Sequence, residues 1–101
     1  MFIVLSHHYC KPDQLGVARE RMDQNGAAMT SEPGFAYRYR IERPTHPNIL
    51  SALTAWNDEA DYQRYRQKRF GAGHDLKTTP YDKVESETYQ VHSTHGKTPG
   101  A

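Results

Sequence analysis

Apolar side chains recur along this chain with two alternating periods. Four segments repeat apolar or aromatic residues at every second position, which is the period of a β-strand. These segments are residues 2–9, 34–43, 48–56 and 84–92. Between them, residues 12–31 and 57–69 carry apolar residues three or four positions apart, as one face of a helix requires. The pattern therefore predicts six elements in the order β-α-β-β-α-β, the split βαβ arrangement.

Both predicted helices have sequence signals at their ends. The first begins at Pro12 and Asp13, because a first turn tolerates proline and favours aspartate, and it ends near Ser31. Its inner stripe consists of Leu15, Ala18, Met22 and Met29. The second begins at Asn57 or Asp58, whose side chains can accept hydrogen bonds from free backbone N–H groups. Its inner stripe consists of Ala60, Tyr62 and Tyr65.

The chemistry of the strand faces predicts the order of the strands. The first and third strands are apolar on both faces, which suits the centre of a sheet, whereas the second and fourth carry charges and suit its edges. This order gives an α+β, ferredoxin-like fold, with a four-stranded antiparallel sheet and two helices on one face. The apolar groups on the opposite face then need another cover. A second copy of the chain is the simplest one, so we expect a homodimer.

Composition narrows the class of protein. A chain of 101 residues forms one domain, and its seven tyrosines add apolar surface to a core that is poor in aliphatic residues. With 13 basic and 12 acidic residues the net charge is only +1, which makes binding to nucleic acid or to an anionic membrane unexpected. Cys10 is the one cysteine, and the apolar start FIVL is too short for a signal peptide. We therefore expect a cytoplasmic protein.

Two stretches resemble a known family. EPGFAYRYRI at residues 32–41 and LTAWNDEADYQRYR at residues 53–66 are similar to the antibiotic biosynthesis monooxygenase (ABM) family. The shared pattern is a Pro-Gly start to the second strand, an apolar third strand that ends in tryptophan, and an acidic helix start. The resemblance implies an ABM-like domain over residues 1–92 and a dimeric α+β barrel in which two sheets face each other. The remaining residues, 93–101, are expected to form a flexible tail.

The resemblance also implies a chemistry. Monooxygenases of this family typically need no metal or flavin, because a deprotonated, electron-rich substrate reduces oxygen itself. The protein then has to bind an aromatic ring, take a proton and stabilise an anion. Trp56 could wall a cleft between the second helix and the sheet, opposite Tyr65 and beside Leu53, with Tyr37 or Tyr39 supplying a hydroxyl group. Alternatively, the Trp56 side chain only packs that helix onto the sheet.

Histidines are the candidate proton carriers, because their ordinary pKa suits work near neutral pH. His7 and His8 are adjacent in a strand, so they point to opposite faces and one of them faces the helices. His74 follows Trp56 by eighteen residues, in a Phe-x-x-x-His stretch similar to the one that supplies the axial ligand in haem-degrading members of the superfamily. Those enzymes carry an asparagine on the first strand, where this chain has Ser6, His7 and His8, and a second tryptophan at the position of Tyr65. His74 can equally be a loop histidine without a function.

Three functions are compatible with the sequence. The first is a homodimeric, cofactor-independent monooxygenase that acts on a small aromatic or quinol-like compound. The second is a dimeric module that binds a small ligand without catalysis, because this fold does not settle function. The third is a haem-binding or haem-degrading oxygenase. The sequence contains no cysteine pair, HExxH, GxSxG or glycine-rich phosphate loop that would add another candidate.

Overall fold

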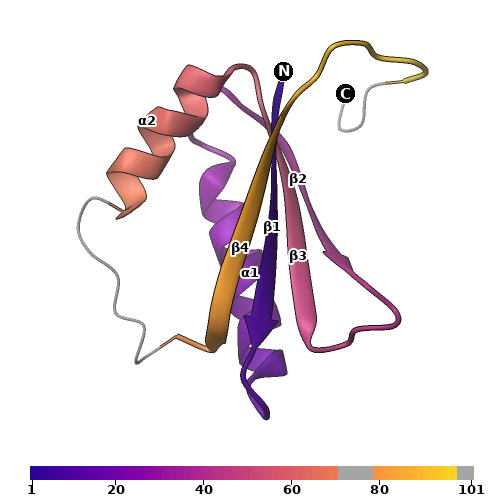
Figure 1. The fold of residues 1–101 in the computed structure, drawn as a ribbon. Helices are drawn as coiled ribbons and strands as arrows, with labels where there is room; N and C mark the ends of the chain where they lie inside the picture. The colour runs from indigo at the N-terminus through magenta and orange to yellow at the C-terminus, as the bar shows by residue number, and fades with distance from the viewer. Residues whose placement is uncertain (71–78, 98–101) are drawn as a thin grey trace.

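The computed structural model describes residues 1–70 and 79–97, and its elements follow the predicted order (Figure 1). They are β1 (Phe2–Cys10), α1 (Leu15–Met29), β2 (Phe35–Glu42), β3 (Ile49–Trp56), α2 (Glu59–Phe70) and β4 (Tyr81–Gln90). The prediction of a ferredoxin-like α+β fold is confirmed. In the described part of the chain, neither helix has the length and apolar character needed to cross a membrane.

The strand order is β2-β3-β1-β4, with every neighbouring pair antiparallel. The two strands that are apolar on both faces, β1 and β3, therefore lie at the centre, and the charged strands β2 and β4 form the edges, as predicted. The register between the central strands pairs Phe2 with Trp56 and Leu5 with Leu53. Because paired residues point to the same side of a sheet, this register fixes which side chains share a face.

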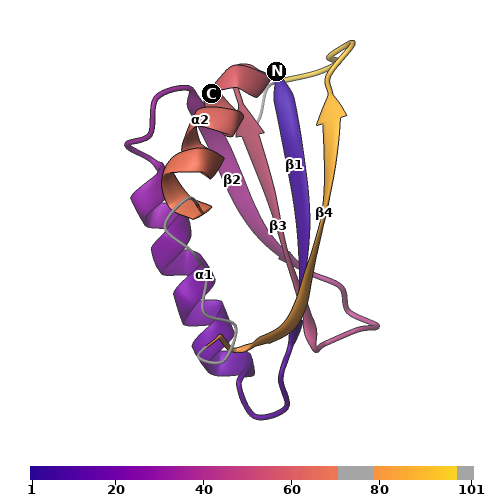
Figure 2. The ribbon, with the colours of Figure 1, turned by 60° about the vertical axis from the view of Figure 1, so that its left-hand side comes forward.

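Both helices lie on the same side of the sheet, as Figure 2 shows. We call this side the helix face and the other side the open face. The helix face carries Phe2, Val4, Ser6, His8, Arg38, Arg40, Leu50, Ala52, Thr54 and Trp56. The open face carries Ile3, Leu5, His7, Tyr9, Tyr37, Tyr39, Ile41, Ser51, Leu53 and Ala55. His7 and His8 thus point to opposite faces, which confirms the alternation predicted for them.

The core of the described chain consists of two clusters under the helix face. In the first, Ala18 and Met22 of α1 pack against Cys10, Leu50 and Ala52. In the second, Met29 packs with Phe2, Val4 and Trp56, and the rings of Phe35, Tyr62 and Tyr65 surround them. The inner stripe predicted for α1 is confirmed at Ala18, Met22 and Met29, all of which are buried. Helix α2 contributes the tyrosines Tyr62 and Tyr65 to the second cluster. A tyrosine combines an apolar ring with a hydroxyl group, so this end of the core contains both.

Three predicted details are wrong. Pro12 and Asp13 form a turn before α1, because the backbone of Asp13 is left-handed, with φ 67°, and cannot continue into a helix. Ala60 is exposed rather than inside, because Tyr62 and Tyr65 face the sheet and a residue two positions before Tyr62 lies about 200° away around the helix. The last strand begins at Tyr81 rather than at residue 84.

The start of α2 is held close to the start of β2. Asp58 caps the helix, because its carboxylate accepts the backbone N–H of Asp61 at 3.0 Å, as predicted. The backbone N–H of Asn57 donates to the carbonyl of Gly34 at 2.8 Å. Gly34 has φ +82°, and a Cβ atom there would stand 2.0 Å from Cγ of Asp61. Only glycine satisfies both conditions, which explains the Pro-Gly start of β2.

Candidate functional site between the helices and the sheet

Trp56 is the centre of an aromatic cluster on the helix face. It is fully buried, and its ring centroid lies 5.2 Å from that of Tyr65, 5.9 Å from Phe35 and 6.2 Å from Tyr62. The local sequence produces this arrangement, because Trp56 ends a central strand and the Asp58 cap starts α2 within two residues. The first turns of α2 then return across the indole ring. Trp56 therefore packs the helix onto the sheet, beneath the rings of Phe35, Tyr62 and Tyr65.

Three buried polar atoms in this layer have no hydrogen-bond partner among the described residues. They are Nε1 of Trp56, Nδ1 of His8 and the hydroxyl oxygen of Tyr81. Leaving such a group unpaired costs about 1–3 kcal/mol, so buried polar groups are ordinarily bonded to protein, water or a ligand. Trp56 is on β3, His8 on β1 and Tyr81 on β4. Trp56 is paired with Phe2 of β1, and the distance from Phe2 to His8 along β1 is roughly 20 Å at the usual rise per residue, so Trp56 and His8 lie at opposite ends of the layer. The layer thus contains polar atoms for which the described residues supply no partner.

His8 lies on β1, beside Tyr81 of the neighbouring edge strand β4. Its ring centroid lies 4.8 Å from that of Tyr81. The pKa of His8 is lowered from 6.5 to about 4, mainly by burial; a backbone hydrogen bond with Leu50 raises it in part, and the charges of Arg38 and His7 contribute to the lowering. Burial also raises the pKa of the Tyr81 phenol. At neutral pH His8 is therefore an uncharged imidazole that can accept a proton or a hydrogen bond.

Arg38 of β2 lies along the sheet between Trp56 and His8, because it is paired with Thr54 of β3. Its guanidinium donates hydrogen bonds to Oγ1 of Thr54 at 3.2 Å and to the sulfur of Met29 at 3.4 Å. No carboxylate of the described residues forms an ion pair with it. Burial lowers the pKa of Arg38, although an arginine stays charged at neutral pH. Burial raises the pKa of the Tyr65 and Tyr81 phenols, and the charge of Arg38 offsets part of that rise. The layer thus contains a desolvated positive charge.

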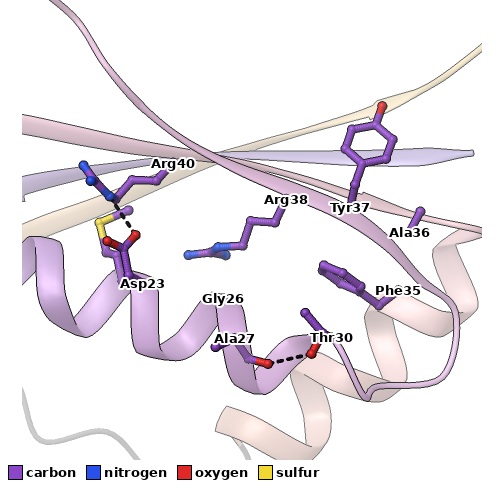
Figure 3. Close-up of a pocket in the computed structure, with 10 residues that line it drawn as sticks. Asp23, Gly26, Ala27, Thr30, Phe35, Ala36, Tyr37, Arg38 and Arg40 are labelled. Carbon is purple, nitrogen blue, oxygen red and sulfur yellow. Dashed lines mark hydrogen bonds and ion pairs between the residues drawn. The ribbon is translucent and has the colours of Figure 1, made fainter. Parts of the chain in front are cut away.

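A cavity of about 410 Å³ opens between α1 and β2, at the edge of the sheet. It is lined by Met22, Asp23, Gly26, Ala27, Thr30, Phe35, Ala36, Tyr37, Arg38 and Arg40. In Figure 3, the guanidinium of Arg38 extends from β2 into the space facing α1, whereas the ring of Tyr37 points away on the opposite side of the strand. Phe35 links the cavity to the aromatic cluster, because its ring also contacts Trp56 edge-on.

The structure brings together only part of the predicted site. Trp56 and Tyr65 are in contact, and both lie in the helix–sheet layer. On the open face, Nδ1 of His7 bonds to Oγ of Ser51 at 2.8 Å, and the hydroxyl of Tyr37 contacts the sulfur of Met1 at 3.8 Å. Tyr39 and Leu53 are paired in register on that face as well. His74 lies outside the described residues.

The expectation of one cleft that combines Trp56 and Tyr65 with a hydroxyl of Tyr37 or Tyr39 is therefore wrong in its geometry. The sheet separates the two groups, because odd-numbered positions of β2 from Tyr37 onward point to the open face while Trp56 points to the helices. The same alternation separates His7 and Leu53 from Trp56. The individual roles of His7, His74, Tyr37, Tyr39 and Leu53 stay predictions.

Sequence reasoning missed Arg38, Tyr81 and the specific role of His8. Arg38 alternates with Tyr37 and Tyr39, and the pattern predicts that a charged strand face meets water, whereas this one faces the helices. Position 8 shares its face with Phe2 and Val4, so a continuation of that alternation would have placed His8 inside. Tyr81 fell in a predicted loop, and no signal in the sequence marked it as part of the layer.

The open face exposes a large aromatic and aliphatic surface. Tyr39, Ile41 and Tyr89 are 45%, 43% and 48% exposed, and the partly buried side chains of Leu5 and Leu53 lie between them. Nearby, Nε2 of His7 lies 3.4 Å from a carboxylate oxygen of Glu87. Among residues 1–70 and 79–97, no group of three or more histidine, cysteine, aspartate or glutamate side chains is placed to hold a metal ion.

The fold and this layer define a class: a ferredoxin-like α+β domain with aromatic and polar side chains enclosed between its helices and its sheet. No protein-family model matches the sequence, and no curated protein is significantly similar to it. Solved structures do share the fold, and several of them are named as antibiotic biosynthesis monooxygenases, as the resemblance implied.

Three of these structures cover nearly the whole chain. A Deinococcus radiodurans protein provisionally named as an antibiotic biosynthesis monooxygenase is 13% identical with a TM-score of 0.79, over 97% of this chain and 99% of that one. SnoaB, a cofactor-independent oxygenase from Streptomyces nogalater, is 14% identical with a TM-score of 0.77, over 95% and 97%. MhuD, a haem degrader from Mycobacterium tuberculosis with two haems bound in its active site, is 13% identical with a TM-score of 0.77, over 95% and 100%. At these identities the likeness is one of fold.

Proposed function

We propose that this protein is a cofactor-independent monooxygenase that acts on a small aromatic or quinol-like compound in the helix–sheet layer. The observation that carries the proposal is the set of buried polar atoms without partners among the described residues of this layer: His8 Nδ1 and the Tyr81 hydroxyl at one end, and Trp56 Nε1 at the other. The fold shared with the oxygenase SnoaB supports the same class of activity. The layer also contains the three groups that such a reaction needs, which are an aromatic wall, a proton acceptor and a positive charge.

Each group has a defined task in this proposal. The substrate ring lies against Tyr81, whose ring centroid is 4.8 Å from that of His8, while Trp56 and Tyr65 close the other end of the layer. His8 accepts the proton of an acidic hydroxyl or methylene group, since its imidazole is uncharged at neutral pH. The fixed charge of Arg38 stabilises the resulting anion, and a desolvated charge does this better than one in water. Because Arg38 stabilises the anion, it lowers the basicity that His8 must supply.

The anion then transfers electrons to molecular oxygen, which is the oxidant. For a methylene group beside a phenol, carbon loses two hydrogens and gains one oxygen atom as a carbonyl, while the second oxygen atom leaves as water. Carbon loses four electrons in this conversion and oxygen gains four, so no further reductant is needed. The task of the protein is confined to binding, deprotonation and electrostatic stabilisation.

Oxygen uptake with a panel of hydroquinones and anthrones tests the proposal. We expect turnover with at least one compound, and a fall of about 10²- to 10⁴-fold in His8→Gln, the usual contribution of a general base. The variants His7→Gln and His74→Gln belong in the same series, because they carry the alternative predictions for the proton acceptor. If one of them stops turnover while His8→Gln does not, the assignment of His8 is wrong. If no compound is oxidised but several bind, the protein is a binding module.

Haem is a weaker candidate. The residues that line the α1–β2 cavity include no histidine, and the axial ligand that the resemblance implies, His74, lies outside the described residues. Among the described residues, the α1–β2 cavity thus offers no histidine that could bind haem iron. Addition of hemin to the purified protein should leave the Soret band unshifted. A shift that His74→Ala abolishes would favour the haem function instead.

We further propose that the open face is covered by a second copy of this chain. The exposed side chains of Tyr39, Ile41 and Tyr89 support this, because such a surface exceeds what single scattered apolar residues present. An interface of this kind typically buries about 800 Å² per partner. We expect analytical ultracentrifugation to show a dimer at micromolar concentration, and Leu53→Glu, at the centre of the face, to shift the protein to a monomer. A wild-type monomer under these conditions would contradict the proposal.

A further inference from the structure

The two arginines on the helix face of β2, Arg38 and Arg40, have different hydrogen-bond partners. Arg40 bonds to Asp23 at 2.8 Å and also pairs with Glu42, which accepts a second arginine, Arg19, at 2.9 Å. Arg38, two positions earlier and more deeply placed, has only a hydroxyl oxygen and a thioether sulfur as acceptors among the described residues. The acids near this face are thus already engaged with Arg40 and Arg19. Arg38 keeps an uncompensated charge, and an unpaired buried charge is costly.

The opposite wall of the cavity is shaped around Arg38. Gly26 lies in the last turn of α1, and glycine in a helix is less favourable than alanine. A Cβ atom at this position would stand 3.3 Å from both Cδ and Nε of Arg38. One of the two glycines of α1 therefore lies at the turn against which the arginine packs, and its missing Cβ leaves room for the Arg38 side chain between helix and sheet.

The remaining cavity wall suits an aromatic acid. Phe35, Ala27 and Met22 supply apolar surface for a planar ring, and Phe35 continues into the cluster around Trp56. A guanidinium carries five N–H donors in a planar fork that matches a carboxylate, and the described contacts of Arg38 involve only one of its terminal nitrogens, Nη1. A carboxylate at this point would accept two of the other donors, and the remaining donors of the guanidinium would still face the layer.

We propose that the α1–β2 cavity is a recognition site for the carboxylate of an aromatic acid, held by Arg38 against α1. This inference deepens the proposed function, on which it rests for the identity of the natural substrate, because it states which substituent that substrate carries. It also makes Arg38 select among ligands rather than only stabilise a reaction anion. Neutral aromatic compounds of the same size therefore bind more weakly.

Calorimetric titration with 2-naphthoate and its neutral isostere 2-naphthamide tests this selection, because neither compound is a hydroquinone and binding is measured without turnover. Hydrogen bonds to charged groups correspond to about a tenfold to a hundredfold change in affinity. We expect the wild-type protein to prefer 2-naphthoate by at least about tenfold, and Arg38→Gln to lose that preference. Arg64→Gln, which removes an exposed arginine paired with Asp61 on α2, is the charge-matched control and should keep it.

A second variant keeps the test decisive if Arg38→Gln does not fold, as judged by circular dichroism. Gly26→Ala retains the charge but crowds the Arg38 stem, and it should weaken binding of 2-naphthoate more than binding of 2-naphthamide. Equal affinity of the wild-type protein for the two compounds, or no binding of either, overturns the inference. A carboxylate preference without oxygen uptake would leave this site standing and remove the proposed oxygenase, whereas uptake without the preference would do the reverse.

Discussion

Burial of His8 should make the stability of this protein depend on pH. Folding lowers the pKa of His8 from 6.5 to about 4, so between these values the unfolded chain binds a proton that the folded chain excludes. The stabilisation is complete above pH 6.5 and is lost as the pH falls toward 4. From the two pKa values, the free energy of unfolding at pH 5 should be about 2 kcal/mol lower than at pH 7.

Urea denaturation at pH 7 and pH 5 measures this difference, and His8→Gln should remove most of it, because glutamine does not titrate. The exposed His92 provides the control, since His92→Gln removes an imidazole without opening the buried layer. A ¹³C-labelled histidine spectrum of the folded protein gives the pKa of His8 directly. An imidazole of His8 that titrates near 6.5, or an equal loss of stability in wild type and His8→Gln, would refute the reasoning from burial.

Three further substitutions test local features by thermal or urea denaturation. Gly34→Ala should lower the free energy of unfolding by at least about 2 kcal/mol, because the added Cβ would meet Asp61 and the backbone of Gly34 has a positive φ. Gly16→Ala, which has open space around it in α1, should raise the free energy of unfolding by about 0.5–1 kcal/mol. Equal effects of the two substitutions would contradict the close approach of Gly34 to Asp61. Tyr81→Phe should leave stability unchanged or higher, because its buried hydroxyl has no partner in the described chain, and a loss above about 1 kcal/mol would reveal one. Trp56→Ala should cost about 3–5 kcal/mol, and a cost below about 1 kcal/mol would mean that the ring does not hold α2.

The fold could be predicted well from the sequence, because it depends on patterns that repeat over many residues. The apolar character of both faces of β1 and β3 placed these strands at the centre, and the Asp58 cap placed the start of α2. Errors occurred where a single backbone angle or helix rotation decides the outcome. The left-handed backbone of Asp13 and the outward position of Ala60 are examples, since neither changes the average pattern of its segment.

The candidate site could be predicted less completely, because it depends on which way each strand face points. The contact between Trp56 and Tyr65 follows from the sequence, since one ends a strand and the other lies two turns into the next helix. The pattern around Arg38 predicts a surface residue, and only the register with Thr54 shows that it faces the helices. A charge inside a small domain contradicts the average behaviour of arginine, so pattern reasoning alone assigns it to water.

The central position of β1 also constrains how this chain folds during synthesis. β1 is made first, yet one of its two neighbours, β4, lies about eighty residues later, as in the contact between Ser6 and Ser86. Until the ribosome releases β4, the first strand has a bare hydrogen-bonding edge in the middle of an unfinished sheet. Nascent chains that stop before residue 81 should therefore be the forms most exposed to strand pairing with each other, and the ones most dependent on chaperones.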